Sequence, residues 1–81
     1  MLVQYMNAAL GHAQFERLPY GWLGYIPEFE NLWVLDETRV KCEEELWIAL
    51  EQWLISSRDK GLPIPVVDGL DLTTWASRHA G

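Results

Sequence analysis

The 81-residue chain has a single cysteine, two histidines and only six basic residues, and each scarcity excludes a class of protein. Cys42 has no partner for an internal disulfide, and no signal peptide precedes the first expected element, so we expect the reducing cytoplasm. Six Lys and Arg residues against twelve Asp and Glu argue against binding to the phosphate backbone of nucleic acids. The longest uninterrupted apolar run, Leu46–Leu50, has only five residues, which excludes a membrane span.

Groups that could carry catalysis or bind a metal are few and scattered. His12 and His79 lack the spacing of a metal-binding histidine pair, and no second cysteine could complete a site. Cys42 falls on the inward side of a predicted amphipathic helix, where a lone cysteine packs as a small apolar residue. The sequence also has no glycine-rich phosphate loop. We therefore expect no enzymatic activity from this chain alone, and no metal or cofactor.

What the chain does have is apolar and aromatic surface. Nearly half of its residues are hydrophobic, at 49 %, and five are tryptophan, which excludes a disordered chain. A chain of this length forms one domain near the lower limit for independent folding. We therefore expect a homo-oligomer, a dimer or higher.

The first half of the sequence predicts a helix and then three antiparallel strands. From Leu2 to His12, apolar residues recur at intervals of three and four, which favours a helix over the alternative of a strand. Gln14–Leu18 alternates polar and apolar residues and ends at a proline. After a turn at Pro19-Tyr20-Gly21, Trp22–Ile26 returns as the second strand of a hairpin. The short apolar run Leu32–Leu35 has the length of a third strand.

A long helix should follow. Thr38 is a suitable N-cap, the run from Arg39 to Arg58 contains no Gly or Pro, and Gly61 is a suitable C-cap. At 100° per residue, one side of this helix is apolar and should lie on the sheet. That face consists of Cys42, Leu46, Ala49, Leu50 and Trp53, with Trp47 and Leu54 beside it.

Beyond the helix, Gly61–Val67 predicts a fourth strand, which its two prolines restrict to an edge, and Asp68-Gly69 then turns the chain. Residues 1–72 should form the domain, followed by a C-terminal tail over residues 73–81 that is frayed or loosely docked from Ala76. The fold class is thus α+β in two layers. An N-terminal helix precedes a β-β-β-α-β unit whose three-stranded antiparallel sheet is covered by one long helix.

Two features indicate a binding surface. Ile48 and Ile55 point nearly opposite the core face, either as oligomer contacts or as scattered surface residues. Trp22 and Trp33 lie on neighbouring strands of a sheet that the helix covers on one side, so one of them could face outward. An exposed tryptophan beside acidic residues is typical of a protein-recognition surface.

The negative charge is concentrated in one segment. Glu28–Glu51 contains eight acidic and two basic residues and accounts for the whole net charge of −6, since the stretches on either side are each neutral. This segment indicates either a basic protein partner or an ordinary solubilising surface.

The order of several motifs resembles the HicB-type antitoxin family, in the small subgroup that begins with a helix and has no DNA-binding domain. The motifs are Tyr20-Gly21-Trp22-Leu23-Gly24-Tyr25-Ile26-Pro27, Leu32-Trp33-Val34, Thr38, Cys42-Glu43-Glu44-Glu45-Leu46, Trp53 and Gly61-Leu62-Pro63-Ile64-Pro65. The resemblance covers about residues 2–72.

The resemblance implies a two-layer fold related to a partial ribonuclease H-like arrangement. It also implies a partner, a small basic toxin of the HicA type that cleaves messenger RNA and is neutralised when its active surface is covered. Many members are dimers or higher assemblies. On this basis the predicted partner-binding residues are Trp22, Tyr25, Glu28, Glu30, Trp33, Asp36, Glu37 and Glu44, and the predicted oligomer contacts are Ile48 and Ile55.

The sequence departs from the family pattern at three positions. Tyr25 replaces the acid before Ile-Pro, Glu28 replaces the glycine after it, and Asn31 replaces the glycine before the family's Val-Trp pair. These changes put a toxin contact at that loop in doubt. No C-terminal DNA-binding domain is expected, so direct DNA binding is not expected either. The alternative function is a structural or adaptor module that uses the same fold within a larger assembly, without a toxin.

Overall fold

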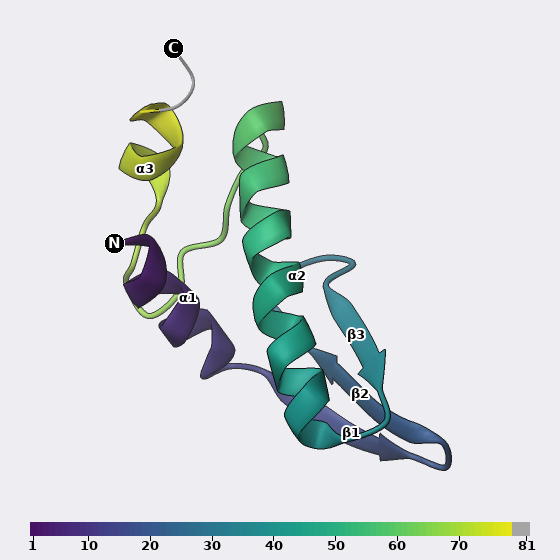
Figure 1. Cartoon of the computed structure of the whole chain (residues 1–81). Coiled ribbons are helices and arrows are strands. Elements are labelled where there is room, and N and C mark those ends of the chain that lie inside the picture. Colours follow the sequence, from purple (N-terminus) through teal and green to yellow (C-terminus); the bar gives the residue numbers. More distant parts are fainter. Residues whose placement is uncertain (79–81) are drawn as a thin grey trace.

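The computed structural model describes residues 1–78, in which a three-stranded sheet lies against one end of a long central helix (Figure 1). An N-terminal helix and the C-terminal segment lie along the other end of that helix. This is the predicted α+β fold. The elements are α1 (Leu2–Leu10), β1 (Gln14–Leu18), β2 (Gly21–Tyr25), β3 (Trp33–Asp36), α2 (Arg39–Lys60) and α3 (Thr73–Arg78).

The sheet has the order β1-β2-β3, and both strand pairs are antiparallel. Phe15, Gly24 and Val34 stand opposite one another in the register, so they share one face of the sheet. α2 lies on this face. At Gly24 the helix comes so close that an added Cβ atom would be 2.8 Å from the Sγ atom of Cys42. The glycine therefore allows the tight contact between sheet and helix.

The ends of α2 are set by the predicted caps. The Oγ1 atom of Thr38 accepts a hydrogen bond of 3.2 Å from the backbone N–H of Lys41. Gly61 takes a left-handed backbone conformation, with φ of 67°, and donates to the carbonyl of Arg58. Among the described residues, no helix combines the length and the apolar character needed to cross a membrane.

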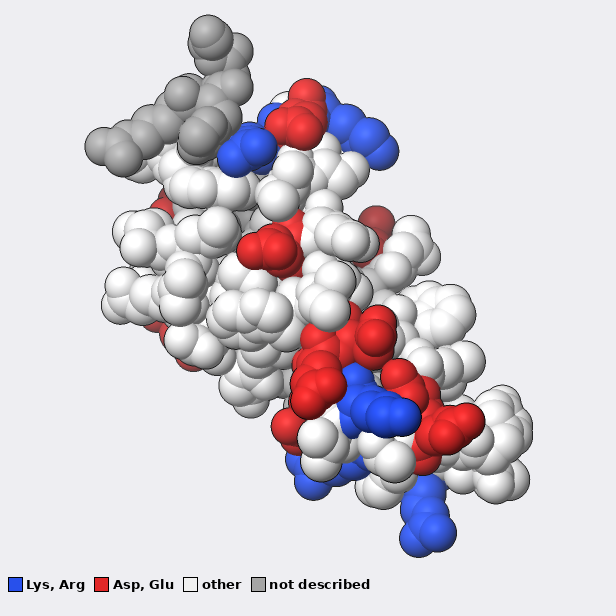
Figure 2. All heavy atoms as spheres, in the orientation of Figure 1, with Lys and Arg blue, Asp and Glu red and all other residues white. Residues whose placement is uncertain are grey.

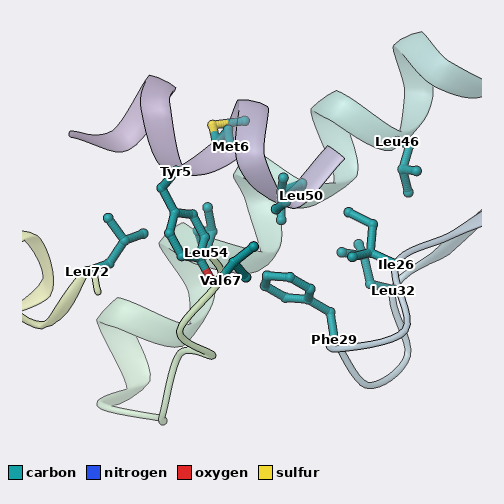
Figure 3. Packing of buried hydrophobic residues seen from close by; sticks show 11 residues of the cluster. Tyr5, Met6, Ile26, Phe29, Leu32, Leu46, Leu50, Leu54, Val67 and Leu72 are labelled. Atoms are coloured by element: carbon teal, nitrogen blue, oxygen red, sulfur yellow. The ribbon is translucent and has the colours of Figure 1, made fainter. Parts of the chain in front are cut away.

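The buried side of α2 winds around its axis. Cys42, Leu46, Leu50 and Leu54 are fully buried, whereas Trp53 and the other predicted core residues of this helix are only partly so. Each step of four residues advances about 40° around the helix, so this stripe turns from the sheet toward α1. Leu54 therefore lies within the core rather than beside it, against Tyr5 and Val67 (Figure 3).

The predicted fourth strand over Gly61–Val67 is wrong, since this segment pairs with no strand of the sheet. Pro63 and Pro65 have no N–H to donate to a ladder. The segment is held instead by the Tyr5 hydroxyl, which donates to the Pro65 carbonyl. We call residues 61–72 the strap, because it returns along α2 and past α1 (Figure 1).

The tail is more ordered than predicted. α3 forms from Thr73 to Arg78, and Asp71 accepts hydrogen bonds from the backbone and the hydroxyl of Thr73, which lower the pKa of its carboxyl. The Trp75 ring packs under the guanidinium of Arg58, with its centroid 4.8 Å from Cζ. Trp75 thus docks the start of this helix, and the backbone from Ala76 to Arg78 is helical where the sequence predicted a frayed or loosely docked tail. His79 lies outside the described residues.

Candidate partner-binding site

The predicted partner-binding residues do not form one surface. Tyr25 and Trp33 stand opposite each other on the face of the sheet that points away from α2. Trp22 and Asp36 are also paired, at the other end of these strands and next to the start of α2. Trp33 is the outward tryptophan, with 57 % of its surface exposed, and Trp22 is half-buried. The alternation of side chains along a strand explains why the two differ.

The predicted acidic residues Glu28 and Glu30 lie in the loop between β2 and β3, where Glu28 has an internal partner. His12 contacts the Glu28 carboxylate through Nδ1 and the Asp68 carboxylate through Nε2, the latter at 2.7 Å. His12 thus joins the end of α1 to both the loop and the strap. Hydrogen bonds to Asp68 and then to Glu28 raise the pKa of His12 above its ordinary value of 6.5.

This histidine makes the stability of the protein depend on pH. Because its pKa is raised in the folded state, protonated His12 stabilises the fold fully below pH 6.5, and this contribution is lost as the pH rises through the raised pKa. We expect the urea midpoint of the wild type to fall as the pH is raised above 6.5. His12→Gln should lack that fall. Parallel pH curves for the two proteins would show that the two contacts do not form in solution.

The other acidic residues gather at the start of α2. We call Asp36, Glu37, Glu43, Glu44 and Glu45 the acidic end. Figure 2 shows carboxylates clustered around basic side chains over the first half of α2 and the adjoining end of the sheet. All of these acidic residues except the half-buried Asp36 are exposed.

One of the basic residues at the acidic end, Arg39, has partners of its own. Arg39 pairs with Glu43 at 3.6 Å, and its guanidinium stacks 4.9 Å above the Phe15 ring. Thus Arg39 is engaged within the chain, and the acidic end keeps an excess of negative charge.

A hollow of about 420 Å³ opens beside the acidic end. Trp22 and Tyr20 supply aromatic surface to its lining, and Asp36 and Glu37 supply carboxylates. Lys41 also lines it. An aromatic ring and carboxylates together suit a guanidinium or ammonium group, through stacking and charged hydrogen bonds. Sequence reasoning named the tryptophan and the two acids, but it missed Tyr20 and Lys41, which only the fold brings to them.

Cys42 lies at the contact between helix and sheet. It is fully buried, and its Sγ atom is 3.7 Å from the carbonyl oxygen of Trp22 and 3.8 Å from that of Val34. Burial raises the pKa of the thiol, which disfavours the nucleophilic thiolate.

In the described part of the chain, no group of three or more His, Cys, Asp or Glu side chains is placed to hold a metal ion.

The three departures from the antitoxin pattern each have a structural role. The Tyr25 hydroxyl donates to Glu16 at 3.4 Å, and Glu28 contacts His12. Asn31 adopts a positive φ of 61°, a conformation that asparagine tolerates better than most residues other than glycine. Next to it the loop holds Phe29, which is buried and stacks edge-on against Tyr5 and Trp53. Phe29 is thus a core residue that the sequence pattern did not predict.

Comparisons with known proteins agree with this architecture. The crystal structure of TTHA0281 from Thermus thermophilus is similar, with a TM-score of 0.77 and 27 % sequence identity, over 85 % of this chain and 88 % of that one. No curated protein matches the sequence significantly. The sequence pattern of the UPF0150-like family matches residues 4–65, which is most of the chain. The protein therefore belongs to the UPF0150-like family.

Proposed function

We propose that this protein is an antitoxin of the HicB type, which binds a small basic ribonuclease of the HicA type and neutralises it by covering its active surface. The observation that carries the proposal is the exposed negative charge of the acidic end, next to a hollow lined by aromatic side chains. The motif order that resembles HicB-type antitoxins supplies the class of partner. The proposed compartment is the cytoplasm, where the messenger RNA cleaved by such a toxin is found.

The acidic end is a better contact for a basic partner than the loop between β2 and β3. Glu28 in that loop is already engaged with His12, and the carbonyl of Glu30 accepts a hydrogen bond of 3.2 Å from Trp53. In contrast, Glu44 and Glu45 are exposed, and no described side chain pairs with them. Unpaired carboxylates of this kind attract a basic surface from a distance and speed its association.

The hollow gives the contact an anchor. An arginine from the partner would stack on Trp22 and bind the carboxylates of Asp36 and Glu37. Aromatic residues in such half-enclosed positions are common among the residues that dominate binding energy. The surrounding glutamates would then set the sign of charge that the partner must carry.

The test uses the tagged protein as bait in a lysate of its native host at low salt, with mass identification of what it retains. We expect a basic chain of the size of a small domain, lost when the Debye length is cut from about 10 Å at 0.1 M salt to about 3 Å at 1 M. Binding to the purified partner should weaken about tenfold or more in the triple variant Glu43→Gln, Glu44→Gln, Glu45→Gln. The control pair Glu51→Gln and Asp59→Asn, farther along α2, should bind like the wild type.

Two outcomes would contradict the proposal. A complex equally strong at both salt concentrations would remove its electrostatic basis. Partners that survive the triple variant but are lost with Ile48→Asp would favour the adaptor alternative, because the side chain of Ile48 is 48 % exposed on the outer side of α2.

A further inference from the structure

One face of the sheet is left uncovered. The side chains of Leu23 and Leu35 stand opposite each other on it, as do those of Tyr25 and Trp33. These residues alternate with Gly24 and Val34, which face α2, and no described helix lies over the opposite side (Figure 1). We call this surface the open face, defined by Leu18, Leu23, Tyr25, Trp33 and Leu35.

The open face is apolar and poor in charge. Trp33 is 57 % exposed and Leu35 is 50 % exposed, in adjacent positions on this side of β3. The carboxylate on this side of the described strands is that of Glu16, which already accepts a hydrogen bond from Tyr25. A contiguous apolar surface of this kind marks an interaction site more often than a free surface.

The open face combines an exposed tryptophan with a hollow. The hollow, of about 580 Å³, lies at its loop end, and its lining includes Leu23, Tyr25 and Trp33 itself. A projecting side chain next to a hollow is compatible with a dimer of twofold symmetry, because the projecting side chain of each copy can enter the hollow of the other. A buried tryptophan in a pocket is the usual anchor of such an interface.

We propose that the open face binds a second copy of this chain, with Trp33 of each copy seated in the hollow of the other. Charge selects this occupant. Two copies that each carry a net charge of −6 repel wherever their acidic surfaces meet, and the open face lets them approach without that repulsion. The carboxylate that Glu16 contributes on this side of the described strands already accepts a hydrogen bond from Tyr25, so a basic partner gains more at the acidic end.

The size of the face sets the strength of the dimer. Three strands about 4.8 Å apart and at most five residues long span roughly 14 by 17 Å. This is small beside the roughly 800 Å² per partner that stable complexes bury. We therefore expect a weak dimer, with a dissociation constant on the order of 10 µM.

The experiment is sedimentation velocity of the full chain from about 1 to 500 µM, a range that brackets that dissociation constant. We expect a monomer–dimer equilibrium whose dissociation constant rises at least tenfold in Trp33→Glu and in the independent variant Leu35→Glu. Val66→Glu is the matched control, because this valine is 57 % exposed on the strap, and it should leave the dimer unchanged. Ile48→Glu tests the other predicted oligomer contact, on α2, and here too the dimer should persist. Trp33→Ala removes the indole ring without adding charge and should also weaken the dimer. Far-UV circular dichroism identifies any variant that fails to fold.

Salt separates this proposal from the proposed function. The dimer should persist or strengthen as salt is raised, since screening reduces the repulsion between acidic copies, whereas the complex with a basic partner should weaken. A wild type that stays monomeric at every concentration would overturn the proposal. A dimer that dissociates in Ile48→Glu but not in Trp33→Glu would overturn it too, and would place the contact on α2. If the wild type forms no dimer and the Trp33→Glu variant no longer binds a basic partner, the open face is the binding site of that partner instead.

Discussion

Replacing Tyr5 with alanine is expected to lower the free energy of unfolding by about 3–5 kcal/mol. Tyr5 is fully buried, stacks edge-on against Phe29 at 6.4 Å between ring centroids, and binds the Pro65 carbonyl through its hydroxyl. The side chain therefore joins α1, the loop before β3 and the strap (Figure 3). For a domain of this size, the loss corresponds to a fall of roughly 15–30 °C in Tm, which thermal denaturation followed by circular dichroism would measure.

Tyr5→Phe separates the packing of the ring from the hydrogen bond of the hydroxyl. The phenylalanine keeps the contact with Phe29 and loses only the bond to Pro65, which should cost about 1 kcal/mol. Equal losses in the two variants would contradict the buried position of the ring. A loss in Tyr5→Ala well below that of an ordinary core truncation would mean that the strap does not close over α1.

Replacing Gly24 with alanine should destabilise the protein by about 1–3 kcal/mol, although the change adds one methyl group. The new Cβ atom would lie 2.8 Å from the Sγ atom of Cys42 and 3.0 Å from the Phe15 ring. Both neighbours are held between the sheet and α2, so the helix must shift or the ring must rotate. Urea denaturation of the purified variant would measure the effect.

Removal of the sulfur atom should relieve this clash. Cys42→Ala alone leaves a small cavity, but in the Gly24→Ala background it makes room for the new methyl group. The double variant should therefore be more stable than the sum of the two single changes predicts, by about 0.5–3 kcal/mol. Strict additivity would show that the helix and the sheet are not in contact at this point.

The two proposed surfaces can be used at the same time. The open face points away from α2, while Glu43, Glu44 and Glu45 of the acidic end are carried by that helix. A dimer formed through the open face would therefore present two acidic ends to two basic partners. This arrangement predicts that the dimer and the partner complex respond to salt in opposite directions, as the two experiments above would show.

Local sequence patterns specify the elements themselves. The proline at the end of β1, the glycine turn before β2 and the Thr38 cap act on their immediate neighbours, so their effects can be read from a short window. The alternation of side chains along β3 likewise separates Trp33 from Val34 on opposite faces, although it does not say which face the helix covers.

How distant segments meet depends on the complete fold. Tyr5 contacts the strap across 60 residues of sequence and His12 contacts Asp68 across 56, and no periodic pattern encodes such pairs. The apolar run of the strap looks like a strand locally, but its prolines and the fully buried Tyr5 hold it against α1 instead. The first two helices, the three strands and the excess of acid could therefore be predicted from the chain alone, whereas α3 could not. Packing determines which carboxylates remain free and which face of the sheet stays uncovered, because both depend on contacts between residues far apart in the sequence.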